Sequence, residues 1–348
     1  MQRHIAQPAR LDLDSPGRRD YWVAIEHDTM WGAHFVPLTV IVGPDAAAHP
    51  ERGLVAFGAT HGNEYEGPVA IKQLLHEIRT EDVLGRLILV PVLNAAAFRI
   101  GQRDSMEDDR VNLNRAFVDN AGVAPLGGAT HRIAQFVREF IWPRVHVSID
   151  LHAGGHLAQF ALCVGVQAIG TPEQTRQSIA AARWFGTPLV TCSTFQADTP
   201  GLLNMDALRQ GKISLGGEFG WGTAVNPFGV RCARHGILAT AIHHGQMRGS
   251  IEPHAHHADG TQKVVSIGGT GITHAPWPGL FEPLVECGAW VRHGQPIAHL
   301  HDFHHIDSPP LVLTADCDGF VMSLAWNASV RQGQIVGVIA SEIDPENG

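Results

Sequence analysis

The sequence predicts an α/β domain followed by a smaller all-β domain. Before about residue 250, short apolar runs typical of buried strands alternate with helical spacing. The clearest examples are a strand at 54–57, a helix at 67–79 and a strand at 87–93. From residue 264 on, the apolar runs are short, rich in β-formers and separated by Gly or Pro, with no helical spacing. We therefore expect a catalytic domain over 1–250 and a β-rich domain over 251–348.

The order of elements in the first domain indicates a sheet with parallel strands. Apolar runs at 21–25 and 36–42 precede the strand–helix–strand unit, whose short connections are typical of parallel pairing. Residues 94–128 lack periodicity, and a loop this long inside a domain is usually functional or disordered. Further along we expect helices near 133–141, 172–185 and 237–242 and strands at 145–151, 160–166, 189–192 and 212–219.

The second domain contains an internal echo. The stretches 279–297 and 319–335 each read as a strand, a turn, the pattern V-R-x-G-Q and another strand. This predicts a small pseudo-symmetric β-sandwich shaped like a biotinyl or lipoyl carrier. Carriers hold their cofactor on a lysine, and residues 264–348 contain none. We therefore expect a structural or access-controlling domain.

Composition excludes several classes of protein. The 348 residues are enough for two domains, and a net charge of −9 with only three lysines argues against a nucleic-acid-binding surface. No apolar run approaches the ~20 residues of a membrane span, and the first twenty residues lack the apolar core of a signal peptide. The five cysteines form no CxxC pair, which fits reduced thiols in the cytoplasm. A homo-oligomer is possible, as for many enzymes.

Three residues have the character of a zinc site. His61 and Glu64 follow the strand at 54–57 in a glycine-flanked loop, and His152 follows the strand at 145–151. Imidazole and carboxylate groups suit zinc, and a catalytic zinc has three protein ligands and one open position, whereas a structural site is usually closed by four Cys or His ligands. An open position allows activation of water and polarisation of a carbonyl. We predict one zinc per chain; the alternative is a helix-capping histidine beside a solvated acid.

The other histidine clusters are interpreted as ordinary surface imidazoles. They are His243-His244, His254-Ala-His256-His257 and His304-His305. None of them is combined with a carboxylate in a loop at the end of a strand.

Four motifs, in the order HGNEYEGP, NLNRAF, DLHAGG and GGEFG, resemble those of the succinylglutamate desuccinylase/aspartoacylase family. The resemblance covers about residues 10–345. It implies a zinc-carboxypeptidase-like mixed sheet flanked by helices, with a barrel-sandwich-like domain after it. The implied activity is removal of an N-acyl group, acetyl first among them, from a small amino acid such as N-acetyl-2,4-diaminobutyrate. A deacylase of another N-acyl amino acid, a metallocarboxypeptidase and an esterase remain alternatives.

The resemblance also implies roles for individual residues. His61, Glu64 and His152 would bind zinc, Glu218 would be the general base, Arg103 would stabilise the oxyanion, and Asn114 and Arg115 would hold the substrate α-carboxylate. Arg110 is a rival for the role of Arg103. Asp150 is either a partner that orients an imidazole or a simple strand-end residue. A non-catalytic binding protein with this fold would show a broken metal set, and here the set is complete.

Overall fold

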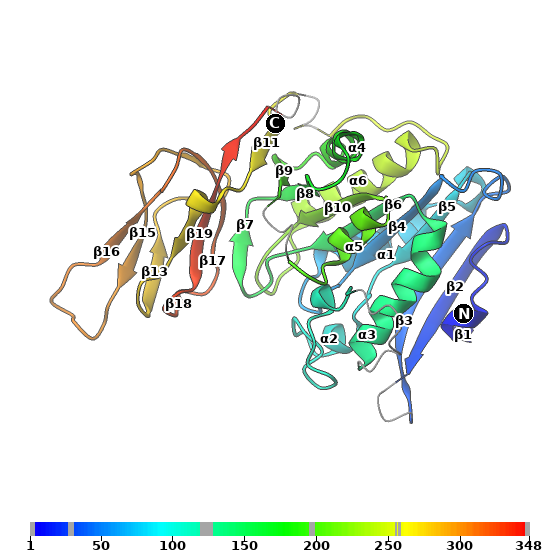
Figure 1. Ribbon diagram of the computed structural model, residues 1–348, viewed down its shortest axis with the longest axis horizontal. Coiled ribbons are helices and arrows are strands. Elements are labelled where there is room, and N and C mark those ends of the chain that lie inside the picture. The colour runs from blue at the N-terminus through cyan, green and yellow to red at the C-terminus, as the bar shows by residue number, and fades with distance from the viewer. Residues whose placement is uncertain are drawn as a thin grey trace.

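The computed structural model describes residues 4–26, 31–118, 128–194, 199–254, 256 and 259–344. Its larger part contains a mixed sheet with helices on both faces (Figure 1). The strands of this part are β1 (His4–Ala6), β2 (Gly17–Glu26), β3 (Ala33–Val42), β4 (Gly53–Gly58), β5 (Arg86–Val90), β6 (Val147–His152), β8 (Cys163–Gln167), β9 (Leu189–Ser193) and β10 (Ile213–Glu218). Their order in the sheet is β1-β2-β3-β5-β4-β6-β10-β8-β9.

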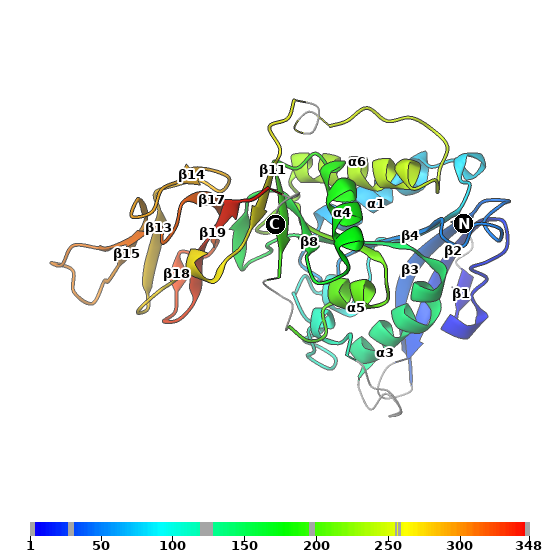
Figure 2. The ribbon, with the colours of Figure 1, turned by 45° about the horizontal axis from the view of Figure 1, so that its top comes forward.

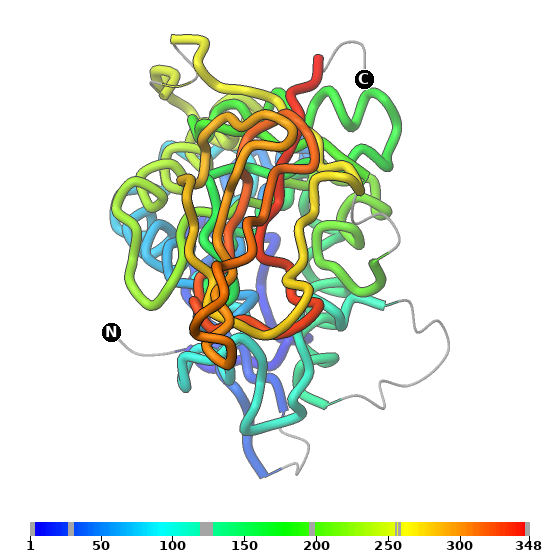
Figure 3. Tube along the Cα trace, turned by 90° about the vertical axis from the view of Figure 1, so that its left-hand side faces the viewer, coloured from blue at the N-terminus to red at the C-terminus, as the bar shows by residue number. Residues whose placement is uncertain are grey.

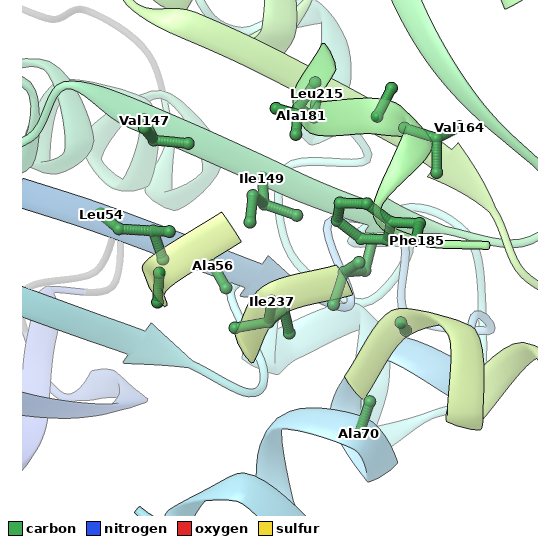
Figure 4. Packing of buried hydrophobic residues seen from close by; sticks show 14 of the residues in the cluster. Leu54, Ala56, Ala70, Val147, Ile149, Val164, Ala181, Phe185, Leu215 and Ile237 are labelled. Carbon is green, nitrogen blue, oxygen red and sulfur yellow. The ribbon is translucent and has the colours of Figure 1, made fainter. Parts of the chain in front are cut away.

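Helices cover the two faces of this sheet (Figure 2). One face carries α1 (Glu66–Glu77), α4 (Pro172–Arg183) and α6 (Pro227–His243), and the other carries α3 (Ala129–Phe136) and α5 (Leu203–Arg209). Strand β4 shows why the sequences of the central strands are continuously apolar. Leu54 and Ala56 pack into the first core with Ile237 of α6 (Figure 4), whereas Val55 and Phe57 point into the second. Both faces of the strand are therefore buried.

The predicted strand–helix–strand unit is confirmed. Strands β4 and β5 pair in parallel and are joined through α1, and β4 also pairs in parallel with β6. The two strands before them are confirmed as β2 and β3, which pair with each other in antiparallel fashion.

Three predicted elements differ from the structure. The long loop holds a short helix α2 (Ala95–Arg99) and a 3₁₀ turn η3 (Leu113–Arg115), and part of it, 119–127, lies outside the described residues. The strand predicted at 160–166 is two strands, β7 (Ala158–Phe160) and β8, which join different partners. Helix α6 begins ten residues before the predicted helix, at Pro227, where the Asn226 side chain caps two backbone N–H groups.

The C-terminal strands continue the large sheet and add a second one. They are β11 (Lys263–Ser266), β12 (Ile272–His274), β13 (Gly279–Pro283), β14 (Trp290–Val291), β15 (Pro296–His301), β16 (Leu311–Thr314), β17 (Gly319–Ala325), β18 (Ser329–Val330) and β19 (Ile335–Glu342). Strand β11 pairs with β9 and with β19, which links the two parts, and the separate antiparallel sheet has the order β16-β15-β13-β18. Figure 3 views the molecule from this end. A domain division at residue 250 stays a prediction.

The internal echo of the second part is a structural repeat. In both copies the glutamine side chain accepts a hydrogen bond from the backbone N–H of the arginine three residues earlier, at 3.1 Å (Arg292 with Gln295, and Arg331 with Gln334). The glycine between them has a positive φ in both copies, +79° and +77°. The two turns therefore have the same construction, and only glycine adopts this φ at no steric cost.

The described residues contain five unpaired cysteines, three of them buried. Within the same part of the chain, no helix combines the length and apolar character that a membrane span requires.

Candidate active site

Two neighbouring strand ends bring the predicted metal ligands together. His61 and Glu64 lie in the loop between β4 and α1, and His152 is the last residue of the parallel neighbour β6. Ala59 begins this loop with a φ of +49°, an uncommon value for a residue with a side chain. A Cβ on Gly62 would lie 2.1 Å from the carbonyl carbon of Ala97, so the loop packs directly on the backbone of α2.

The three side chains form a buried cluster around one carboxylate. His61 Nδ1 lies 2.8 Å from Glu64 Oε1, and His152 Nδ1 lies 2.9 Å from Glu64 Oε2. The potential ligand atoms all lie within 4.8 Å of one another, and the three residues are buried. Two imidazole nitrogens and a carboxylate are the donor set of many catalytic zinc sites, so these residues fit the metal that the sequence predicts.

Each imidazole is held by a partner on its far side. His152 donates from Nε2 to Asp150 Oδ2 at 2.7 Å, and the other oxygen of Asp150 accepts from the Thr60 hydroxyl at 2.6 Å. His61 Nε2 lies 3.2 Å from Asn112 Oδ1. Both rings therefore turn Nδ1 toward Glu64. Partners of this kind fix ring orientation at metal sites, and of the two interpretations of Asp150 the structure supports the orienting one.

Burial and the neighbouring charges shift the pKa values of this cluster in different directions. Burial alone would lower the pKa of His152, but the Asp150 and Glu64 carboxylates raise it well above its ordinary value. Burial lowers the pKa of His61 against the opposing effect of Glu64. Burial would raise the pKa of Glu64, but the two histidines keep it well below its ordinary value. Glu64 thus stays ionised at neutral pH, as a metal ligand must be.

Glu218 lies beside the cluster with no hydrogen-bond partner for one of its oxygens. It ends strand β10, in register with His152 at the end of β6. Its Oε2 atom is buried and has no partner among the described residues. Burial, and then the charge of Glu64, raise the pKa of Glu218 to about 8. A carboxyl group with a pKa near neutrality, next to a metal-type cluster, suits proton transfer.

The long loop contributes the three polar residues that the sequence singles out. Arg103 donates from Nη1 to Glu64 Oε1 at 3.0 Å, which places its guanidinium beside the cluster. Asn114 accepts a hydrogen bond from the backbone of Leu203 at 2.8 Å, and its amide nitrogen lies 3.4 Å from His152 Nε2. The Arg115 side chain donates to the carbonyl of Asn114. Burial lowers the pKa of Arg115, and Arg103 lowers it further.

The structure separates the two rival arginines. Arg103 lines the cavity described below, whereas Arg110 is exposed and does not line it. The backbone of Arg110 has a φ of +60° in a tight turn of the loop.

All seven predicted site residues line one cavity of about 850 Å³. One wall comes from the larger part and includes Thr191 and Ser214 of the sheet and Asn204 of α5. The opposite wall is built from β17 to β19 and their connections, with Met322, Ser323, Asn327, Arg331 and Gln334 among its residues. The C-terminal part thus contributes to the lining of the site, and its structural or access-controlling role stays a prediction.

Sequence reasoning missed two residues of this site. Asn112, the partner of His61, is the first asparagine of the NLNR motif, but nothing in a single sequence separates its role from that of Asn114. Arg331 belongs to the second V-R-x-G-Q turn, and only the packing of β18 against the site shows that it reaches the cavity.

Comparison with known proteins gives consistent matches. Residues 50–243 match the model of the succinylglutamate desuccinylase/aspartoacylase catalytic domain. An N-alpha-acetyl-L-2,4-diaminobutyric acid deacetylase from Halomonas elongata is 29% identical over 99% of this chain and 97% of its own. The product-bound ectoine utilization protein EutE (DoeB) from Ruegeria pomeroyi is 28% identical, with a TM-score of 0.83 over 95% of this chain and 98% of its own. A succinylglutamate desuccinylase/aspartoacylase from Rhodobacter sphaeroides is 29% identical, with a TM-score of 0.85 over 96% and 98%.

Proposed function

Since the chain belongs to the succinylglutamate desuccinylase/aspartoacylase family, we propose that it is a zinc-dependent amidohydrolase of small N-acetylated amino acids. N-acetyl-2,4-diaminobutyrate is the first candidate substrate, because the full-length relative from Halomonas elongata bears that name and covers nearly the whole of both chains. The reaction adds water across the amide and releases acetate and the free amino acid. The five unpaired cysteines fit action in a reducing compartment, and we propose the cytoplasm.

One observation carries the proposal. A buried His61–Glu64–His152 cluster shares one cavity with two arginines and with the carboxyl group of Glu218, one oxygen of which has no hydrogen-bond partner among the described residues. The cavity is large enough for a small acylated amino acid, and residues of β17 to β19 line it together with those of the larger part. The family and the deacetylase from Halomonas elongata favour a deacylase over a carboxypeptidase.

We propose that His61, Glu64 and His152 would hold one zinc ion, which would supply Lewis-acid polarisation of a carbonyl and activation of water near neutral pH. Asp150 and Asn112 keep the two imidazoles in the ligating orientation.

Two groups of this chain then act on the reacting atoms. Glu218 takes a proton from the attacking water and passes it to the amide nitrogen, so the C–N bond breaks and a neutral amine leaves. The Arg103 guanidinium stabilises the negative charge that forms on the carbonyl oxygen. Its hydrogen bond to Glu64 shows that it reaches the cluster.

The α-carboxylate of the substrate is assigned to Arg115 with Asn114. A guanidinium binds a carboxylate through two parallel hydrogen bonds, which fixes the orientation of the amide as well as the affinity. Arg115 lines the cavity together with Arg103, so one arginine is available for the α-carboxylate and the other for the oxyanion that forms at the scissile carbonyl.

A substrate panel tests the proposal. The compounds are N-acetyl-2,4-diaminobutyrate, N-acetyl-aspartate, N-succinyl-glutamate and a dipeptide with a free C-terminus, each with chelator and after zinc is restored. We expect chelator-sensitive release of an amine from one N-acyl compound and none from the dipeptide. Hydrolysis of the dipeptide alone would favour the carboxypeptidase, and turnover that chelation leaves unchanged would contradict the zinc mechanism.

A pair of variants tests the assignment of the oxyanion group. Arg103→Ala should lower kcat by about 100-fold or more, the usual cost of losing one such donor. Arg110→Ala is the matched control in the same loop and should retain full activity, since Arg110 does not line the cavity. Equal losses in the two variants would overturn the assignment.

A further inference from the structure

A second group of metal-type ligands lies on the outer face of the C-terminal sheet. Glu282 Oε2 lies 3.0 Å from His299 Nδ1 and 2.8 Å from His301 Nε2. The potential ligand atoms of the three residues all lie within 4.8 Å of one another, as in the buried cluster. We call this group the outer cluster.

Strand register explains how the outer cluster forms. His299 and His301 are two residues apart on β15, so both side chains project from the same face of the sheet. Glu282 on β13 is directly opposite His299 in the antiparallel ladder. Leu300, between the two histidines, and its cross-strand partner Phe281 project from the opposite face of the sheet and are buried in the core. The pleat therefore separates a packed face from a face that carries three ligands.

We propose that the outer cluster is a second metal site of this protein, for a late first-row divalent ion such as Zn²⁺. Two imidazoles and one carboxylate suit zinc, copper or nickel, whereas Mg²⁺ and Ca²⁺ prefer an all-oxygen set. Glu282 Oε2 lies within hydrogen-bond distance of both His299 Nδ1 and His301 Nε2, so three potential metal-ligand atoms already lie close together. An ion with ligand distances of about 2.0–2.1 Å fits between them after small rotations of exposed side chains.

The outer cluster differs from the catalytic cluster in position and exposure. None of its residues lines the catalytic cavity. The side chains are 55% (Glu282), 30% (His299) and 35% (His301) exposed, so a bound ion keeps at least one position open to solvent. Strands β13 and β15 lie at the end of the molecule remote from the helices (Figure 1). The outer site therefore binds metal independently of the reaction and has an open coordination position toward solvent or another molecule.

Zinc stoichiometry tests the proposal on the full-length chain. The protein is stripped with chelator and dialysed against zinc, and bound zinc per chain is measured by elemental analysis. The test variant is His299→Ala/His301→Ala, and the matched control is His304→Ala/His305→Ala, two exposed histidines a few residues on that are outside the cluster. We expect the test variant to bind one zinc fewer than the wild type and the control variant to bind the same number.

A second variant and an activity readout complete the test. Glu282→Gln keeps both imidazoles and should weaken the outer zinc site by at least about tenfold, the least that the loss of even an orienting partner costs. Amide hydrolysis should be unchanged in both variants, since the outer cluster lies outside the cavity. Equal zinc binding by the wild type and the test variant, or an equal loss in the control variant, would overturn the proposal.

Discussion

Replacing Glu218 by Gln should stabilise the metal-free protein above neutral pH while it removes catalysis. Burial and the nearby Glu64 carboxylate raise the pKa of Glu218 to about 8, from an ordinary value of 4.5. Each pKa unit corresponds to about 1.4 kcal/mol, so ionising this group costs the folded state at most about 5 kcal/mol relative to the unfolded chain. Because the side chain is partly open to the cavity, we expect a gain of about 2–4 kcal/mol for Gln.

The sign of this effect defines a pH window. Below about pH 4.5 the carboxyl group is protonated in both the folded and the unfolded states, and Gln has no advantage. Between pH 4.5 and 8 the unfolded chain ionises first, so the penalty on the wild type grows with pH and is complete above pH 8. The gain in unfolding free energy of the variant should follow the same rise.

Urea denaturation in the presence of chelator measures this gain. Wild type and Glu218→Gln are compared at pH 5 and pH 8.5, with the exposed Glu107→Gln as the control. Zinc should reduce the gain, since a nearby cation stabilises the ionised carboxylate. A stability difference that is the same at both pH values, or a Gln variant that is less stable at pH 8.5, would refute the assignment. The same variant should lose about 100- to 10,000-fold in kcat.

Three further predictions concern residues in and around the site. Asp150→Asn should weaken zinc binding by about 10- to 100-fold, because His152 loses the carboxylate that orients its imidazole. Competition with a chelating dye measures the affinity, and an unchanged value would contradict that role. Arg115→Lys should raise KM far more than it lowers kcat, since lysine cannot form the bidentate pair, and a change confined to kcat would argue against carboxylate binding. Gly62→Ala should destabilise the fold by about 1–3 kcal/mol in thermal or urea unfolding, because its Cβ would meet the Ala97 backbone at 2.1 Å. Gly268→Ala, where nothing lies within 4 Å, is the control and should be near neutral.

The metal cluster could be predicted from the sequence because each of its residues lies at the end of a strand that the sequence itself reveals. His61, Glu64 and His152 each follow an apolar strand, and parallel strands end at one edge of a sheet. Once β4 and β6 are neighbours, the three side chains have to be close. Glu218 follows the same rule, because β10 is the parallel neighbour of β6 on its other side.

The features that the sequence did not predict depend on contacts between segments far apart in the chain. Helix α5 has seven residues, too few to show helical spacing, and it forms because Leu203 and Ala207 pack on the sheet. The orienting role of Asn112 and the reach of Arg331 arise only when separate loops meet at the cavity.

The outer cluster is the clearest case of a site that sequence reasoning overlooked. The sequence drew attention only to the neighbouring pair His304-His305, interpreted as ordinary surface imidazoles, and nothing in it distinguished His299 and His301. The structure supplies the carboxylate from Glu282, seventeen residues before His299, through strand pairing. Cross-strand register, which periodicity alone does not reveal, decides which histidines gain a partner.

The most direct test titrates zinc into the chelated His299→Ala/His301→Ala protein, which keeps the buried cluster as its one metal-type group among the described residues. Acetate release from N-acetyl-2,4-diaminobutyrate is followed after each addition. We expect no activity at the start, a linear rise with added zinc and a plateau at one zinc per chain. Full activity before any zinc is added, or no activity on any N-acyl amino acid after one equivalent is bound, would contradict this expectation.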